Sequence, residues 1–179
     1  MIKTRDEIGK LMTLKGYKLA AEIGVQRGDY AKKILSNWDG HLFLFDSWRN
    51  FPTGDYVDVA NVSDEDHKTN LNACLDNLSE YDGRYTLCRA LSPEVSQHFK
   101  DESFDLIYID ANHSYEGCLL DIEGWIKKIK LGGCICGHDY LDGSFWGGNF
   151  GVKRAVLDFF GKNPDIITNE SEPSWFVFV

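Results

Sequence analysis

Apolar residues are grouped along the chain in two kinds of block that differ in their period. Short, almost continuous apolar runs predict β-strands at residues 18–25, 41–46, 84–90, 104–110, 134–139, 166–168 and 175–179. Apolar residues at helical spacing predict helices at residues 8–14, 30–37, 63–78, 115–129 and 152–160, and a further helix that begins at Ser92. Strands without polar alternation are typical of a sheet that helices cover on both faces.

The alternation of strands and helices predicts an α/β fold with a doubly wound, mostly parallel sheet. Residues 47–62 and 142–150 fit neither period. They are rich in glycine and aromatic residues, and they are predicted to be loops. A length of 179 residues suits one globular domain, so we expect a single domain over residues 1–179, which could also be one domain of a larger polypeptide.

The formal net charge of -9 limits the classes of partner. A protein that binds nucleic acid needs a strongly basic face, so we expect no nucleic-acid partner. The five cysteines show neither a CxxC pair nor zinc-ligand spacing. Residues 1–12 lack the apolar core of a secretion signal, and no stretch approaches the roughly 20 apolar residues of a membrane span. We therefore expect a soluble, cytoplasmic protein without a membrane partner.

Charged side chains occur where three of the predicted strands end. Asp46 ends the second strand, Asp110 ends the fourth, and the pair His138 and Asp139 ends the fifth. In open α/β sheets, ligands bind outside the carboxyl ends of the strands. These side chains are therefore expected at the edge of the sheet that carries the functional site.

The first strand runs into the sequence EIGVQRG, which begins at Glu22. A dinucleotide-binding fingerprint requires GxGxxG, but counting from Gly24 places Gln26 and Asp29 where the later glycines belong. This spacing argues against an NAD enzyme. The pattern is instead an acidic residue followed by glycines at positions 24 and 28, and then by Asp46 at the end of the next strand.

Together with the rest of the chain, this pattern resembles the class I S-adenosylmethionine-dependent methyltransferases. The segments that carry the resemblance are, in order, EIGVQRG, LFLFDSW, FDLIYIDANHSYEGCLLDIEGW, LGGCICGHDY and GVKRAVLDFF. They are similar to a small branch related to macrocin-type sugar O-methyltransferases and, more distantly, to catechol O-methyltransferase. The resemblance covers residues 19–179 and implies a Rossmann-like, seven-stranded sheet with an antiparallel C-terminal strand.

The resemblance also implies a site for S-adenosylmethionine. The two glycines would let the backbone approach this cofactor, Glu22 would face the ammonium group of its methionine part, and Asp46 would accept the ribose hydroxyl protons. Ser47 and Trp48 would flank the adenine, and Ser92 would close around it. The structural alternatives are an ion-pair partner for Glu22, a helix cap for Asp46 and an N-cap for Ser92. The expected cofactor site contains Glu22, Gly24, Gly28, Asp46, Ser47, Trp48, Ser92 and Asp110.

In the resembling families a divalent cation lies at the ends of the fourth and fifth strands. This implies a metal site formed by Asp110, His138 and Asp139. The families carry a carboxylate where this sequence has His138, and an imidazole shifts the preference from magnesium towards manganese, iron or zinc. We expect a divalent metal, magnesium or manganese; the alternative is a site without metal.

His113 follows Asp110 by three residues, at the position where the sugar-modifying relatives place a general base. A histidine with a pKa near 6.5 can take a proton from an acceptor hydroxyl at neutral pH. A metal bound to the same oxygen would lower the pKa of that hydroxyl. We therefore expect His113 and Asp110 to be catalytic. The alternative is that His113 caps the helix that follows.

The acceptor must be selected by residues 48–62 and 142–150, because the core fold uses most of the chain. Their aromatic residues suit stacking on a sugar face or an aromatic ring, and these are Trp48, Phe51, Tyr56, Phe145 and Trp146. We expect an O-methyltransferase for a small hydroxylated acceptor, a sugar or glycan terminus ahead of a catechol-like phenol. A homodimer in which the neighbour supplies a lid would suit so short a chain. The alternatives are a cofactor-binding module without catalysis and an NAD or nucleotide-sugar enzyme.

Overall fold

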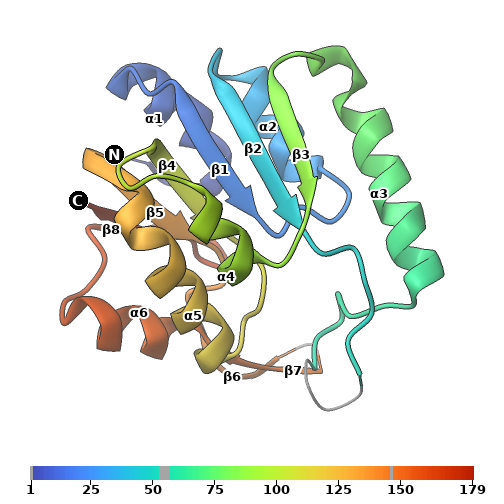
Figure 1. The fold of residues 1–179 in the computed structure, drawn as a ribbon. Coiled ribbons are helices and arrows are strands. Elements are labelled where there is room, and N and C mark those ends of the chain that lie inside the picture. The colour runs from blue at the N-terminus through green and yellow to red at the C-terminus, as the bar shows by residue number, and fades with distance from the viewer. Residues whose placement is uncertain (1, 53–56, 146) are drawn as a thin grey trace.

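The computed structural model describes residues 2–52, 57–145 and 147–179, and its centre is a seven-stranded sheet (Figure 1). The strand order is β3-β2-β1-β4-β5-β9-β8. Strands β1 to β5 pair in parallel, whereas β9 is antiparallel to both β5 and β8. The predicted Rossmann-like sheet with an antiparallel C-terminal strand is confirmed. Its strands are β1 (Leu19–Ile23), β2 (His41–Asp46), β3 (Tyr85–Arg89), β4 (Phe104–Ile109), β5 (Ile129–Gly137), β8 (Ile166–Ile167) and β9 (Trp175–Phe178).

Helices cover both faces of the sheet (Figure 1). One face carries α1 (Ile8–Lys15), α2 (Asp29–Ser36) and α3 (Asp64–Leu78), and the other carries α4 (Ser92–Val95), α5 (Tyr115–Trp125) and α6 (Val152–Phe160). Short 3-10 turns lie at Arg5–Glu7, Ser79–Tyr81, Ser96–His98 and Ile126–Lys128. Among the described residues, no helix has both the length and the apolar character needed to cross a membrane.

The two faces of the sheet belong to two separate apolar cores. Ala20 on β1 packs in the core that includes Met12 of α1. Its neighbour Ala21 packs in the core that includes Ile122 and Trp125 of α5. Successive residues of a strand point to opposite faces, so a strand that is buried on both sides is apolar at every position. This explains why the central strands could be recognised as continuous apolar runs.

The segment predicted as a loop at residues 142–150 departs from the expectation. It forms β6 (Asp142–Phe145) and β7 (Gly148–Gly151), which pair as a small antiparallel sheet, while residue 146 lies outside the described residues. All of β6 is exposed, so no apolar alternation reveals it. In β7, the ring of Phe150 stacks on the ring of His113 with 5.0 Å between their centroids. A contact with a distant segment therefore holds a hairpin that local sequence does not predict.

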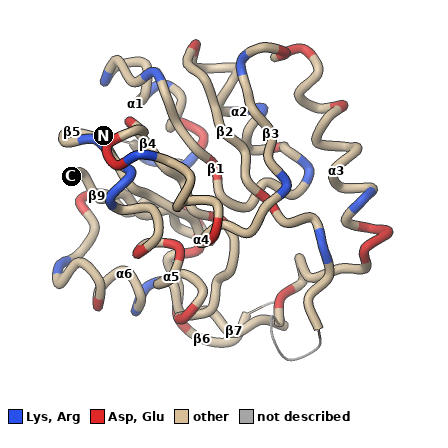
Figure 2. The backbone as a smooth tube through the Cα atoms, in the orientation of Figure 1, with Lys and Arg blue, Asp and Glu red and all other residues tan. Residues whose placement is uncertain are grey.

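Lys and Arg residues are spread over many elements and are interspersed with Asp and Glu (Figure 2). Several of them form exposed ion pairs between neighbouring elements. Lys33 of α2 lies 2.8 Å from Asp6, and Lys32 lies 3.1 Å from Glu80. Such pairs connect α2 to neighbouring 3-10 turns, although each exposed pair contributes only about 0–1 kcal/mol to stability.

Candidate functional site

A cavity of about 650 Å³ opens along the carboxyl ends of the central strands. Its wall comes from the segments that follow β1, β2, β3 and β4 and from the start of α5. The predicted site residues in this wall are Glu22, Gly24, Asp46, Ser47, Ser92, Asp110 and His113. Four other predicted site residues are described but lie outside the wall, and these are Gly28, Trp48, His138 and Asp139.

Gly24 is required by the close approach of two strand ends. Its φ is 85°, in the left-handed region, and a Cβ added there would lie 1.9 Å from the backbone oxygen of Asp110. Only glycine tolerates both conditions. The absence of a side chain therefore lets the segments after β1 and β4 meet at the floor of the cavity.

Gly28 does not itself line the cavity, although its neighbours Arg27 and Asp29 do, so it has no direct place in the expected cofactor site. It is the residue that precedes α2, with a φ of 74°. A Cβ at this position would lie 2.9 Å from the Sγ atom of Cys74 on α3. Gly28 thus serves the packing of α2 against α3, and the second glycine of EIGVQRG has a structural explanation.

Asp46 organises the turn after β1. Its Oδ2 atom accepts hydrogen bonds from the backbone N–H groups of Val25 (2.9 Å) and Gln26 (2.8 Å), and its Oδ1 atom accepts one from Trp48 (2.8 Å). These donors belong to loops, so the helix-cap alternative is wrong. A carboxylate has about four acceptor positions, which leaves capacity for one more donor on the cavity side.

Trp48 was expected to flank an adenine, but its side chain is buried in the core. Only 1% of the residue is exposed, and its Nε1 atom donates to the backbone oxygen of Gln26 at 2.8 Å. Its φ is 39°, and Trp48 is not among the residues of the cavity wall. The preceding residue, Ser47, does line the cavity.

Ser92 joins a buried polar network instead of capping α4. Leu91 holds the N-cap position, and the Ser92 hydroxyl donates to Oδ1 of Asp121 at 2.5 Å and accepts from Nε1 of Trp125 at 2.9 Å. Burial raises the pKa of the Asp121 carboxyl to about 7, although the Ser92 hydrogen bond and the charge of His113 oppose the rise. Asp121 was not among the predicted site residues, although a carboxylate within the apolar stripe of a predicted helix is a signal for such a residue.

Glu22 presents a buried carboxyl to the cavity. Only 1% of the residue is exposed, and its Oε2 atom has no hydrogen-bond partner among the described residues. Burial raises the pKa of this carboxyl well above its usual value, and the nearby charges of Asp110 and Asp46 raise it further, against the opposing effect of Arg5. A cationic group placed in the cavity would favour the ionised form.

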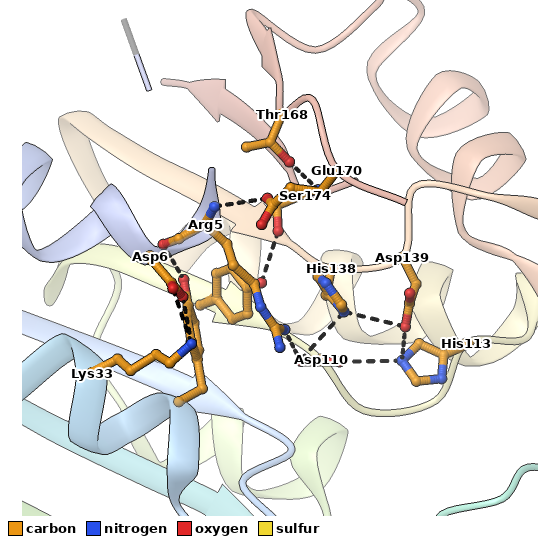
Figure 3. A network of polar contacts seen from close by, with 12 residues as sticks. Arg5, Asp6, Lys33, Asp110, His113, His138, Asp139, Thr168, Glu170 and Ser174 are labelled. Atoms are coloured by element: carbon orange, nitrogen blue, oxygen red, sulfur yellow. Dashed lines mark hydrogen bonds and ion pairs between the residues drawn. The ribbon is translucent and has the colours of Figure 1, made fainter. Parts of the chain in front are cut away.

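Asp110, His113, His138 and Asp139 converge at the ends of β4 and β5 (Figure 3). The His113 Nε2 atom lies 3.3 Å from Oδ1 of Asp110 and 3.2 Å from Oδ2 of Asp139. The His138 Nδ1 atom lies 3.3 Å from Oδ2 of Asp139 and 3.8 Å from Oδ2 of Asp110. One atom from each of Asp110, His113 and Asp139 lies within 4.8 Å of the others, a set that could hold a metal ion. This set contains His113 where the sequence predicted His138.

The protonation of His113 differs from the expectation. Burial alone would lower its pKa, but hydrogen bonds with Asp110 and Asp58, together with the charge of Asp139, raise it to about 10. Its Nδ1 atom lies 2.9 Å from Oδ2 of Asp58, in the loop before α3. His113 is thus an imidazolium at neutral pH in this arrangement, and not a histidine with a pKa near 6.5. Ser114, whose hydroxyl accepts from Gly117 N–H, caps α5 in its place.

The acceptor segments are only partly described. Phe51 lines the cavity, and Phe145 packs edge-on against Phe150 with 5.9 Å between centroids. Tyr56 and Trp146 lie outside the described residues. The stretch at residues 57–61 contributes Asp58 to His113 and several residues to the cavity wall. This stretch therefore connects the segment expected to select the acceptor with the charged side chains at the ends of β4 and β5.

Comparisons with known proteins agree with the fold. The family described as "Methyltransferase domain" matches residues 21–140. Similar solved structures include an O-methyltransferase from Bacillus cereus in complex with SAH, with a TM-score of 0.69 and 16% identity over 98% of this chain and 80% of that chain. A Staphylococcus aureus protein with a proposed caffeoyl-CoA O-methyltransferase function has a TM-score of 0.67 and 17% identity over 98% of this chain and 82% of that chain.

The N-methyltransferase NodS from Bradyrhizobium japonicum has a TM-score of 0.63 and 12% identity over 96% of this chain and 92% of that chain. At such identities the likeness shows the fold alone, and it spans O- and N-methyltransferases. A comparison with curated protein sequences gives no match. The methyltransferase resemblance is thus confirmed at the level of the family, whereas its macrocin-type sugar branch stays a prediction.

Proposed function

We propose that this chain, which belongs to the methyltransferase-domain family, is an S-adenosylmethionine-dependent O-methyltransferase for a small hydroxylated acceptor. The observation that carries the proposal is one cavity of about 650 Å³ whose wall includes both a part suited to binding a nucleoside and a part suited to proton transfer. Asp46 and Ser92 offer polar atoms suited to a nucleoside. Asp110 and His113 offer groups that can hold or release a proton. A methyltransferase needs both functions beside each other.

The cavity suits S-adenosylmethionine in size and polarity. Its volume of about 650 Å³ lies within the range of roughly 300–1,000 Å³ that ligand pockets span. The unpartnered Oε2 atom of Glu22 can accept from an ammonium group, and the remaining acceptor capacity of Asp46 can take a ribose hydroxyl. Bound there, S-adenosylmethionine supplies a methyl group on a positively charged sulfur.

Transfer to a hydroxyl forms an oxygen–carbon bond, breaks the sulfur–carbon bond and releases the hydroxyl proton. The role of the protein is to hold the hydroxyl in line with the methyl group and to take its proton. In this proposal the hydroxyl lies beside His113. His113 can take the proton only after giving up its own, which requires Asp58 or Asp110 to move away from the ring or to be neutralised.

A divalent cation, magnesium or manganese, is part of the proposal. Asp110 and Asp139 would hold it together with His138, because His113 must keep a ring nitrogen free to take the hydroxyl proton. The fit rests on Asp139, whose buried Oδ1 atom has no hydrogen-bond partner among the described residues and whose φ is 50°. When bound, the cation lowers the pKa of a nearby hydroxyl. Carboxylates engaged by a cation hold the His113 proton less strongly, so His113 becomes available as a base.

A sugar or glycan terminus is the acceptor that we favour, because the ring of Phe51 in the cavity wall can lie against the apolar face of a sugar ring. A catechol-like phenol is the second candidate. It is supported by the proposed caffeoyl-CoA O-methyltransferase function of the Staphylococcus aureus neighbour.

Calorimetric titration with S-adenosylhomocysteine, first with EDTA and then with manganese or magnesium, tests the proposal. We expect binding in the micromolar range, and a separate heat for the metal. Release of S-adenosylhomocysteine from S-adenosylmethionine in the presence of sugars and of catechols then tests turnover. Binding without turnover on any hydroxylated acceptor would favour a cofactor-binding module, and an absence of binding would reject the proposal.

A further inference from the structure

An arginine from the N-terminal segment lines the same cavity as Glu22, and the expected cofactor site gave it no role. Arg5 lies in the 3-10 turn before α1. Its guanidinium lies over the ring of Tyr30, 4.9 Å from the ring centroid, and its Nη1 atom lies 3.4 Å from Oδ2 of Asp110 (Figure 3). The charge of Arg5 also acts on the Glu22 carboxyl.

The backbone of Arg5 is fixed by two distant parts of the chain. Its N–H group donates to Oε2 of Glu170 at 2.8 Å, in the segment between β8 and β9 (Figure 3). Its carbonyl oxygen accepts from the hydroxyl of Tyr30 on α2 at 2.9 Å. One residue further on, Asp6 pairs with Lys33 of α2 at 2.8 Å. These contacts hold the arginine at the cavity wall before any ligand arrives.

The contact with Asp110 does not use the full capacity of this guanidinium. A distance of 3.4 Å is long for an N–H···O hydrogen bond, and a guanidinium has five donors. Asp110 is also engaged by His113, whose Nε2 atom lies 3.3 Å from its other oxygen. The hydroxyl of Tyr108 is a second side-chain partner of the guanidinium. Of its five donors, Arg5 therefore still keeps some for a planar anion in the cavity, and carboxylates are the anions that arginine binds with two parallel hydrogen bonds.

A cation and an unpartnered carboxyl oxygen in one cavity wall match a ligand that carries an anionic and a cationic group on the same carbon atom. The Oε2 atom of Glu22 is buried and lacks a hydrogen-bond partner among the described residues. We propose that Arg5 and Glu22 together bind the zwitterionic amino acid head of the methyl donor, with Arg5 taking the carboxylate and Glu22 the ammonium group. The inference rests on the proposed function and adds Arg5 as the residue that recognises the amino acid part. Such a head adds no net charge to an already acidic site.

The test compares two ligands that differ in this head and one methylene group. S-adenosylhomocysteine carries it, and 5′-methylthioadenosine does not. Calorimetry measures both affinities for the wild-type protein and for Arg5→Gln, Arg5→Lys and Lys3→Gln. We expect Arg5→Gln to bind S-adenosylhomocysteine at least about tenfold more weakly and 5′-methylthioadenosine within about twofold of wild type. Arg5→Lys keeps the positive charge but loses the planar pair of N–H donors, so its affinity for S-adenosylhomocysteine should lie between those of wild type and Arg5→Gln.

Lys3→Gln is the matched control, because it removes one exposed positive charge from the same segment. Both ligands should bind it within about twofold of wild type. Equal weakening of both ligands in Arg5→Gln would assign Arg5 a purely structural role and overturn the inference, as would an unchanged affinity for S-adenosylhomocysteine. The ratio of the two affinities is insensitive to the fraction of folded protein. If the wild type binds neither ligand, the proposed function itself fails; if it binds both equally, only this inference fails.

Discussion

Strand β4 has an aspartate at each end, and the two carboxylates are held in different ways. Asp105, near the amino end, accepts from the backbone N–H groups of Lys18 (2.7 Å) and Leu19 (2.8 Å) through Oδ2. Its Oδ1 atom accepts from Nζ of Lys130 at 2.8 Å. Burial would raise the Asp105 pKa, but these hydrogen bonds outweigh it and lower the pKa below its usual value.

Asp110, one residue beyond the carboxyl end, faces ionisable side chains. His113, His138 and Arg5 all lie within 4 Å of its oxygens. Burial would raise the Asp110 pKa, but the hydrogen bond with His113 and the charges of His138, His113 and Arg5 outweigh it, and the pKa is lowered. The two carboxylates are thus shifted in the same direction by different partners.

The comparison separates a structural carboxylate from one that can take part in chemistry. Two of the three donors to Asp105 are backbone groups at the start of β1, which cannot leave without disrupting that end of the strand. The partners of Asp110 are side chains from separate segments, which can change contacts when a ligand enters the adjoining cavity. A lowered pKa alone would not distinguish the two sites, so the nature of the donors is the more useful guide.

Replacing one histidine at the carboxyl ends of the strands and one at the amino ends should give the largest contrast in turnover. His113→Ala is expected to lower turnover by about 100-fold or more, because the general base is removed. The side chain of His41, at the amino end of β2, forms a hydrogen bond with Thr86 Oγ1 at 2.8 Å, far from the cavity wall, and His41→Ala should leave turnover within about twofold. Steady-state rates at saturating donor measure both. Turnover of His113→Ala within a few-fold of wild type would refute the catalytic role.

Asp46 sharpens the comparison, because it has backbone donors like Asp105 but lines the cavity. Asp46→Ala should weaken binding of S-adenosylhomocysteine at least about tenfold, since a hydrogen bond to a charged group contributes about 1.5–3 kcal/mol. Asp105→Ala should leave that affinity unchanged. Calorimetry on both variants measures the effect, and equal affinities for wild type and Asp46→Ala would remove Asp46 from the site.

The structural carboxylate should show its effect in stability. Asp105→Ala leaves the N–H groups of Lys18 and Leu19 without their acceptor, one of them partly buried, and should lower the free energy of unfolding by about 1–2 kcal/mol. Urea denaturation measures this change. Asp105→Asn, which keeps one acceptor oxygen, should lose less. If Asp105→Ala unfolds at the same urea concentration as wild type, water replaces the carboxylate as acceptor without loss of stability.

Asp121 extends the comparison to a carboxyl whose pKa is shifted the other way. Its folded-state pKa of about 7 lies above the unfolded value of about 3.9, so the fold binds the proton more tightly and loses stability as the pH rises through 7. The loss between pH 6 and pH 8 should be roughly 1 kcal/mol. Asp121→Asn keeps an acceptor for Ser92 and should remove this dependence. Thermal unfolding of wild type and Asp121→Asn at both pH values measures this dependence. The same change of stability with pH in both proteins would contradict the raised pKa of Asp121.

The sequence predicted much of the fold because its signals are local. The continuous apolar runs of β1, β2 and β4 depend on burial of both faces, and this pattern is visible in the residues themselves. The hairpin at residues 142–151 was missed because its exposed strand has no such pattern. Six of the predicted cofactor residues line the cavity, but Gly28 and Trp48 serve packing, since a motif does not reveal which way a loop turns.

The sequence by itself determined that charged residues would gather at the carboxyl edge of a parallel sheet, because each strand ends where its apolar run stops. Only the tertiary structure decided how they are partnered. Arg5 and Asp110 are 105 residues apart, and His113 meets Asp58 across 55 residues. Such contacts depend on how whole elements pack, and they raise the His113 pKa to about 10 where its sequence context suggested an ordinary histidine. Protonation is a property of three-dimensional surroundings, which local sequence does not contain.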